Sequence, residues 1–406
     1  MRDRLVPSSA MRVLSSLSMC SSSSSSSSST GSVGIIGGGM AGVAAARHLA
    51  VAGVPVVLHE RTAQLGGRLG TADVDGRAVG MGCLYISAKE SRFVRQLDEW
   101  CKAGHVAEWC DARPHKISAP GVWSPLPVEQ EARWYVGRPH MGSLVQCMLS
   151  EQKGITVRQG DVFDVNHGPP TGWVVATHLT TDAEDEDEEE PDIESHLYEH
   201  LIVATPVDDA AAFLERKVLD RALGRGRYKD FVKERISVAF VFEAGLDLPF
   251  GFAALTFDGS PVTVAIDETS RRAAGEEGAG GKGGGGQVCS RGEEVWVVQS
   301  ATGWARRALD EEWELEAMGN ALLDAFAAGL SRSASEMPAV RAREVVIWPY
   351  GDMDYEVDGG CVWDAELGLA MAGDWAYNGR LEGAWLSGVA AAQRVLDARS
   401  VDEVGH

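Results

Sequence analysis

Residues 33–42 read VGIIGGGMAG. Gly37, Gly39 and Gly42 form a GxGxxG pattern between an apolar run at 33–36 and a helical pattern at 40–52. Gly37 permits a tight turn, Gly39 lets the backbone approach a pyrophosphate, and Gly42 lets the helix pack closely on the strand. The sequence therefore predicts a strand–turn–helix unit that binds a dinucleotide.

An acidic residue supports this interpretation. A second apolar strand is predicted at 55–59, and Glu60 follows it directly. A carboxylate at the end of the second strand can accept hydrogen bonds from ribose hydroxyls. A lone GxGxxG is a weak signal, but here the predicted strand, the predicted helix and the acidic residue all have the spacing of a dinucleotide-binding unit.

The rest of the chain alternates between strand and helix patterns, which indicates an α/β protein with a parallel sheet. Further strands are predicted at 155–158, 173–177, 201–204, 238–242, 295–299 and 345–348. Helices are predicted at 91–103, 141–150, 207–214, 311–328 and 381–396.

Two further blocks are shaped for a dinucleotide. The run Leu65-Gly66-Gly67-Arg68-Leu69 can wrap a pyrophosphate from its second side. Near the other end, Asp374 follows a predicted strand, and a helix starts close to Gly383. The positive end of that helix suits a flavin edge that becomes anionic on reduction.

Together these motifs resemble the flavin amine-oxidase superfamily, and within it the renalase group. The turn at 82–86 (GCLYI), the segment 134–144 (WYVGRPHMGSL) and the strand end at 201–206 (LIVATP) agree with that resemblance. It implies FAD as cofactor and a fold with a Rossmann-type two-dinucleotide-binding FAD domain plus a second α+β substrate domain. The predicted FAD-binding residues are Gly37, Gly38, Gly39, Met40, Ala41, Gly42, Glu60, Arg61, Gly66, Gly67, Arg68, Gly82, Val162, Asp374, Glu382, Gly383 and Ala384.

The chain departs from the family pattern at one turn. Gly80 and Leu84 stand where the family carries an acidic or similar group and a glutamine near the flavin. No catalytic side chain and no metal-ligand spacing can be assigned from the sequence.

The resemblance implies an oxidase that takes a hydride from a small reduced donor and passes the electrons to O2, giving H2O2. In the renalase group that donor is an isomeric dihydronicotinamide. The alternatives are an amine oxidase and a flavin-binding protein without efficient catalysis. The amine alternative is weakened because no lysine follows Lys282, and the corresponding stretch offers Arg341 and Arg343.

The FAD domain is predicted to be discontinuous, at 31–90, 141–206 and 341–406, with the substrate domain at 91–140 and 207–340. An acidic loop is expected at 181–195 and a glycine-rich loop at 273–287.

Residues 1–30 are rich in serine and arginine, as in transit peptides of a plastid or mitochondrion; the alternative is a low-complexity tail on a cytoplasmic protein. The net charge of −22 argues against nucleic acid as a partner, and no apolar run predicts a membrane span. The oligomeric state is left open.

Overall fold

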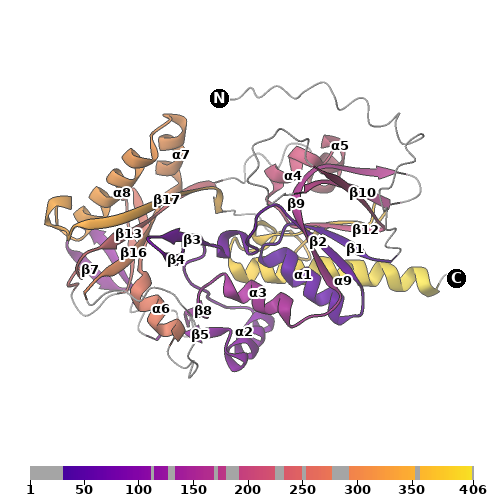
Figure 1. Ribbon diagram of the computed structural model, residues 1–406, viewed down its shortest axis with the longest axis horizontal. Coiled ribbons are helices and arrows are strands. Elements are labelled where there is room, and N and C mark those ends of the chain that lie inside the picture. Colours follow the sequence, from indigo (N-terminus) through magenta and orange to yellow (C-terminus); the bar gives the residue numbers. More distant parts are fainter. Residues whose placement is uncertain are drawn as a thin grey trace.

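The computed structural model describes residues 31–110, 114–126, 133–168, 172–179, 192–224, 233–248, 253–276, 292–352 and 357–404. The predicted leader at 1–30 lies outside the described residues, as do 181–191 of the acidic loop and 277–287 of the glycine-rich loop. Two sheets organise the described part of the chain, each at the centre of one lobe (Figure 1).

The first sheet has the strand order β11-β10-β9-β2-β1-β12-β19-β18. Its strands are β1 Val33–Ile36, β2 Val56–Glu60, β9 Ile155–Gly168, β10 Gly172–Leu179, β11 Ile193–Tyr198, β12 His200–Val203, β18 Val362–Asp364 and β19 Leu369–Met371. The five strands from β9 to β19 in this order run parallel, while β10, β11 and β18 are antiparallel to their neighbours. Both faces of the parallel part are covered, since Ile35 and Ile36 on β1 are both buried in separate core clusters.

Helices α1 (Met40–Val51) and α9 (Leu381–Val404) pack together on one face of this sheet (Figure 1). Gly388 makes their contact close: a Cβ added there would lie 2.1 Å from the carbonyl oxygen of Ala41. The backbones of α1, near the start of the described chain, and of α9, at its end, are therefore in direct contact. Other helices of this lobe are α2 Ser91–Ala103, α3 Ser143–Ser150, α4 Val207–Phe213 and α5 Arg216–Leu223.

The second sheet has the order β17-β13-β16-β15-β14-β6-β7 and is antiparallel except between β14 and β6. Its strands are β6 Pro114–Ala119, β7 Val122–Pro125, β13 Lys233–Phe242, β14 Ala254–Phe257, β15 Val262–Asp267, β16 Glu294–Ser300 and β17 Val340–Asp352. Helices α7 (Thr302–Asp310) and α8 (Leu315–Gly329) cover one face, where Trp304, Leu322 and Phe326 join its core. Helix α6 (Glu268–Glu276) follows β15.

Two small ladders lie between the lobes (Figure 1): the hairpin of β3 (Thr71–Val74) and β4 (Arg77–Gly80), and the pair of β5 (Val106–Glu108) and β8 (Tyr135–Gly137). Arg77 on the hairpin is 1% exposed and bonds to Asp75 (2.7 Å) and to Glu293 (2.8 Å), which precedes β16. Arg341 of β17 pairs with the same two acids. The hairpin is therefore anchored to the second sheet by four charges.

The predicted domain boundaries need three corrections. Helix α2, predicted in the substrate domain, packs on the first lobe, where Phe93 contacts Trp385 of α9. Residues 341–352 belong to β17 in the second sheet, because this strand pairs with β13 over most of its length. Residues 207–223 form α4 and α5, whose Val207, Ala210 and Leu219 pack in the core beneath the first sheet. The predicted acidic loop ends too late, because 193–195 are in β11, and the predicted glycine-rich loop begins too early, because 273–276 are in α6. No helix among the described residues is both long and apolar enough for a membrane crossing.

Candidate functional site

The glycine loop between β1 and α1 has the geometry that its sequence predicts. Gly37 has φ +105°, and a Cβ there would lie 2.8 Å from the carbonyl oxygen of Ala204. A Cβ on Gly42 would lie 1.9 Å from the oxygen of Gly37, so the helix starts in contact with the turn. A Cβ on Gly39 would meet nothing within 4 Å. The backbone at Gly39 therefore faces open space at the N-terminus of α1, where an anion is favoured.

Glu60 lies across this loop at the end of β2. Its Oε2 accepts a hydrogen bond from the Gly38 N–H (2.7 Å), and its Oε1 accepts bonds from the N–H (2.9 Å) and hydroxyl (2.6 Å) of Thr62. These contacts fix the carboxylate beside the glycine loop, and its two oxygens retain further acceptor capacity. The predicted ribose contact of Glu60 stays a prediction.

The second glycine block lies directly against the first. The Gly66 N–H donates to the Gly38 carbonyl (2.9 Å), and Gly39 and Gly66 form a β-bridge. Gly66 and Gly67 have φ of +127° and +54°, in the region that favours glycine. Arg68 then donates to Asp374 Oδ1 (2.6 Å), across 306 residues of sequence. Arg68 and Asp374 were each predicted as site residues; only the structure shows that they pair.

Asp374 follows β19 and begins a short 3-10 helix, Asp374–Ala376. Because β1, β2, β12 and β19 are parallel neighbours, the residues after them share one edge of the sheet. At this edge the hydroxyl of Thr205, which follows β12, is buried and has no hydrogen-bond partner among the described residues. Its methyl carbon would lie 3.1 Å from a Cβ on Gly37.

The N-terminus of α9 offers backbone N–H groups at this edge of the sheet, but the N–H of Ala384, a predicted cofactor contact, is bonded within the helix. Ala384 donates its N–H to the Arg380 carbonyl (2.9 Å), so this amide belongs to the first helical bond. The N–H groups of the residues before it, Gly383 among them, have no intrahelical acceptor by helix geometry. Gly383 also allows a tight approach, because a Cβ there would lie 2.3 Å from Asn378 Oδ1.

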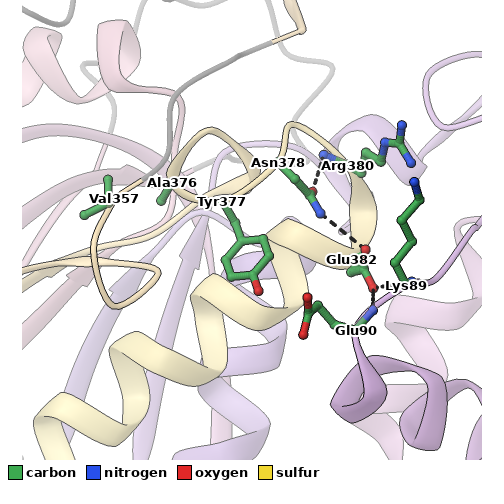
Figure 2. A pocket seen from close by; sticks show the side chains of 8 residues that line it. All are labelled: Lys89, Glu90, Val357, Ala376, Tyr377, Asn378, Arg380 and Glu382. Carbon is green, nitrogen blue, oxygen red and sulfur yellow. Dashed lines mark hydrogen bonds between the residues drawn. The ribbon is translucent and has the colours of Figure 1, made fainter.

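The side chain of Glu382 is held by donors of another segment, and its predicted cofactor contact stays a prediction. It is 2% exposed, and its Oε1 accepts the N–H bonds of Lys89 (2.8 Å) and Glu90 (2.7 Å) (Figure 2). Its Oε2 accepts a bond from Asn378 Nδ2 (3.3 Å). The carboxylate thus attaches the loop before α2 to α9, because two backbone donors there need a buried acceptor.

The remaining predicted residues lie either close to the sheet edge that carries the glycine loop or away from it. Met40 and Ala41 are buried in the first turn of α1. Arg61 is exposed and pairs with Asp209 on α4 (3.2 Å). Val162 is buried with the core cluster of Ile36, beyond the part of β9 that pairs with β2. For Arg61 and Val162 the predicted cofactor contacts stay predictions.

Gly82 lies on the Arg68 backbone. A Cβ there would be 2.3 Å from the Arg68 carbonyl oxygen, which accepts the Cys83 N–H (2.7 Å). The ring of the nearby Tyr85 is stacked on Trp134, with centroids 3.9 Å apart and planes 5° apart. Burial raises the pKa of Tyr85, and Arg380 opposes this rise. Both residues stand in the segments 82–86 and 134–144 that carry the family resemblance, but only the structure shows that their rings stack.

A pocket of about 470 Å³ opens beside the N-terminus of α9 (Figure 2). Lys89 and Arg380 line it together with Glu90, Tyr377 and Asn378. Two cationic side chains, Lys89 and Arg380, and two carboxylates, Glu90 and Glu382, thus line the pocket at this helix N-terminus. Two other tryptophans have partners of their own. Trp385 of α9 packs on Phe93 in the core (5.6 Å between ring centroids), and Trp348 of β17 donates a hydrogen bond to Ser237 (3.0 Å).

Motif analysis missed several buried polar residues of the second lobe. Arg271, Glu268 and Gln299 are each at most 5% exposed and lie at the turn after β4. Asp267 accepts the N–H bonds of Thr269 (2.9 Å) and Ser270 (3.2 Å) at the start of α6, and burial raises its pKa to about 7. None of them stands in a recognisable motif, so only the tertiary structure identifies them.

Comparisons with known proteins agree with this geometry. Residues 35–99 match the family model of an NAD(P)-binding Rossmann-like domain. A solved structure described as a protoporphyrinogen oxidase from Exiguobacterium sp. 255-15 is similar at 10% identity, with a TM-score of 0.62, over 91% of this chain and 100% of that one. Putrescine oxidase bound to putrescine is similar at 14% identity, with a TM-score of 0.57, over 90% and 99%. The chain therefore has the two-domain α/β fold of FAD-dependent oxidases, with a Rossmann-like domain and a second sheet domain.

Proposed function

We propose that this protein is an FAD-dependent oxidoreductase of the amine-oxidase type. The observation that carries the proposal is the Arg68–Asp374 pair (2.6 Å), which joins the second glycine block to the C-terminal motif, while the backbone at Gly39 stays open. The residues present fit the cofactor for two reasons. The space beside the Gly39 backbone is open, so that a pyrophosphate can approach it. The buried hydroxyl of Thr205 at the same edge has no hydrogen-bond partner among the described residues.

Each part of this edge has a task in holding FAD. The backbone at Gly39 and the N-terminus of α1 suit the pyrophosphate, and Glu60 suits the ribose hydroxyls. Asp374 and the first amides of α9 suit the ribityl chain and the pyrimidine edge of the flavin. Bound FAD supplies the capacity to accept a hydride and to return two electrons to O2, giving H2O2.

We further propose that the hydride donor is an isomeric dihydronicotinamide, as in the renalase group. Tyr85 and Trp134 form a flat stacked aromatic pair, and Lys89 and Arg380, which line the pocket beside α9 together with Glu90 and Glu382, can donate hydrogen bonds to the phosphates of such a donor. A donor that is already reduced needs stacking and exclusion of water rather than a base. This requirement fits a site in which no catalytic base was assigned.

The similarity to putrescine oxidase favours a second candidate, an amine oxidase. Arg341 and Arg343 stand in the stretch where many such enzymes place a lysine. Arg341 is paired with Asp75 and Glu293, and Arg343 bonds to Asn320 and lies 3.4 Å from Glu316. Both guanidinium groups are therefore held by partners, Arg341 by the β3–β4 hairpin and Glu293, and Arg343 by residues of α8. The third reading, a flavin-binding protein without efficient catalysis, rests on Gly80 and Leu84.

The FAD assignment is tested with Gly39→Val. The added side chain fills the open space and blocks the backbone from a pyrophosphate, so we expect a folded but colourless protein with less than a tenth of the wild-type FAD content. Gly303→Val is the matched control, because Gly303 is exposed on α7 and a Cβ there also meets nothing within 4 Å. The measurement is the flavin absorbance per protein chain. Stoichiometric FAD in Gly39→Val would show that the loop has another task.

The donor is tested by anaerobic stopped-flow mixing, with bleaching of the flavin band as the signal. We expect fast bleaching by 2- or 6-dihydronicotinamide dinucleotides and slow bleaching by monoamines and polyamines. Arg380→Met should weaken the apparent affinity for the dinucleotide more than the affinity for a dihydronicotinamide without phosphates. The opposite preference among donors would establish the amine oxidase, and no bleaching by either class would favour the binding-only reading.

A further inference from the structure

The turn at residues 80–84 packs against the backbone of Arg68, whose side chain pairs with Asp374. It leaves β4 at Gly80 and ends before Ile86, which bridges to Tyr135. Cys83 donates its N–H to the Arg68 carbonyl (2.7 Å), so the turn is bonded directly to the backbone of the second glycine block. A displacement of this turn would therefore move Arg68.

Two buried side chains of the second lobe hold the turn by its carbonyl groups. Arg271 on α6 donates to Leu84 (2.7 Å) and to Gly80 (3.1 Å). Gln299 on β16 donates to Met81 (2.8 Å) and to Gly82 (2.7 Å). Without these donors, carbonyl groups in a buried turn would lack partners, at a cost in free energy.

Glu268 completes the arrangement. It lies one helical turn before Arg271 on α6, and the two side chains form an ion pair while only 2% and 4% exposed. A buried guanidinium needs such a counter-charge, and its planar shape leaves donors for both carbonyls of the turn. The side chain of Arg271 is thus fixed before it meets the turn.

Gly80 takes part in the same set of contacts. A Cβ at this position would lie 2.8 Å from Nη2 of Arg271, closer than real Cβ contacts. The absence of a side chain at position 80, a departure from the family pattern, therefore leaves the volume that the guanidinium occupies. Gly80 and Arg271 are structurally coupled.

We propose that Arg271 is a positioning residue of the cofactor site: held by Glu268, it locks the turn at 80–84 from the second lobe and so sets the placement of Arg68 against Asp374. This inference rests on the proposed FAD site. It makes the geometry of the cofactor pocket dependent on a residue of the other domain, and it assigns a role to Gly80.

Three variants of the full chain test it: Arg271→Met, Gly80→Ala and the double variant. Arg271→Met keeps the length of the side chain and removes its donors, and Gly80→Ala displaces the guanidinium. Each should weaken FAD binding by about tenfold or more and change the visible circular dichroism of the bound flavin. The double variant should be no worse than Arg271→Met alone, since both changes break one interaction. Arg306→Met is the control, because Arg306 is an exposed arginine of the same lobe paired with Glu234 (3.0 Å).

A second readout needs no cofactor: the rate at which a maleimide labels Cys83, measured by peptide mass spectrometry. Burial raises the pKa of Cys83 to about 11, and the charge of Arg271 opposes the rise. Loss of that charge by itself would slow labelling, so faster labelling in Arg271→Met reports a loosened turn. The exposed Cys110 supplies the reference rate in the same sample.

The outcomes separate the two proposals. Faster labelling of Cys83 with weakened FAD binding and a changed flavin spectrum supports the positioning role. Unchanged labelling, or faster labelling with wild-type FAD affinity and spectrum, overturns it. If the wild type binds no FAD, the proposed function fails, whereas the labelling rates still decide whether Arg271 holds the turn.

Discussion

His59 lies one residue before Glu60 on β2, and its ring is buried on the opposite side of the strand. Its Nε2 is 2.8 Å from the hydroxyl of Tyr198, and its Nδ1 is 3.2 Å from the hydroxyl of Thr177. Burial lowers its pKa from 6.5 to about 3, with smaller contributions from His196 and Arg158. The ring is therefore neutral in the folded protein at neutral pH.

This depressed pKa predicts how stability depends on pH. Below pH 6.5 the unfolded chain binds a proton that the folded chain does not, down to about pH 3. His59 therefore costs stability as the pH falls, by about 1.4 kcal/mol per pH unit at most. We expect His59→Gln to flatten the decline of the urea midpoint between pH 6.5 and 4.5. His178→Gln, on β10 of the same sheet, controls for the loss of a histidine; an unchanged slope in His59→Gln would contradict the assignment.

Single residues also mark the limit of the motif argument. The roles of Gly37, Gly39 and Gly42 follow from their spacing, and the structure confirms the turn, the open backbone and the close helix contact. The partner of a long side chain does not follow from spacing. The position of Glu382 in the C-terminal motif does not indicate that its carboxylate binds the loop of Lys89 and Glu90.

At the scale of elements, periodicity predicts buried strands and amphipathic helices well. The bounds of β1 and α2 agree with the predicted ones. The predicted helix at 311–328 was wrong at its start, because α7 ends at Asp310 and Glu312 adopts φ +53°, so that α8 begins only at Leu315. The strand predicted at 155–158 continues to Gly168, since β10 pairs with its second half.

The contact of α1 with α9 yields a prediction about helix packing. In Gly388→Ala the new methyl group would meet the carbonyl of Ala41 at 2.1 Å, and backbone atoms cannot rotate away. We expect a loss of about 1–3 kcal/mol in unfolding free energy, together with weaker FAD retention. Gly303→Ala, on the exposed face of α7, should instead be neutral or stabilising by up to about 1 kcal/mol. Equal thermal midpoints for the two variants would show that α9 can shift without cost.

At the scale of the whole molecule, the two lobes share one core. The cluster that contains Ile35 and Leu58 of the first sheet also contains Val241 and Val297 of the second. The four-charge anchor of Arg77 and the carbonyl contacts of Arg271 and Gln299 add polar links between the lobes. The sheets are thus packed as one body, although the chain passes between them several times.

This shared core predicts cooperative unfolding. We expect a single thermal transition, coincident in far- and near-ultraviolet circular dichroism, because exposing one lobe would also expose apolar surface of the other. FAD at a hundred times its dissociation constant should raise the stability of this transition by about 2.7 kcal/mol. Two separate transitions, only one of them shifted by FAD, would show that the lobes unfold independently.

The sequence by itself determined the dinucleotide loop, the α/β class and the meeting of the N-terminal and C-terminal motifs at one edge of the parallel sheet. These follow from local steric rules for glycine, from apolar periodicity and from the common edge of parallel strands. Only the tertiary structure decided that β17 belongs to the second sheet, that Arg68 pairs with Asp374, and that Arg271 and Gln299 hold the turn at 80–84. Such pairings join residues far apart in the chain, and their free energy depends on burial and on which donor reaches which acceptor, which spacing along a sequence does not encode.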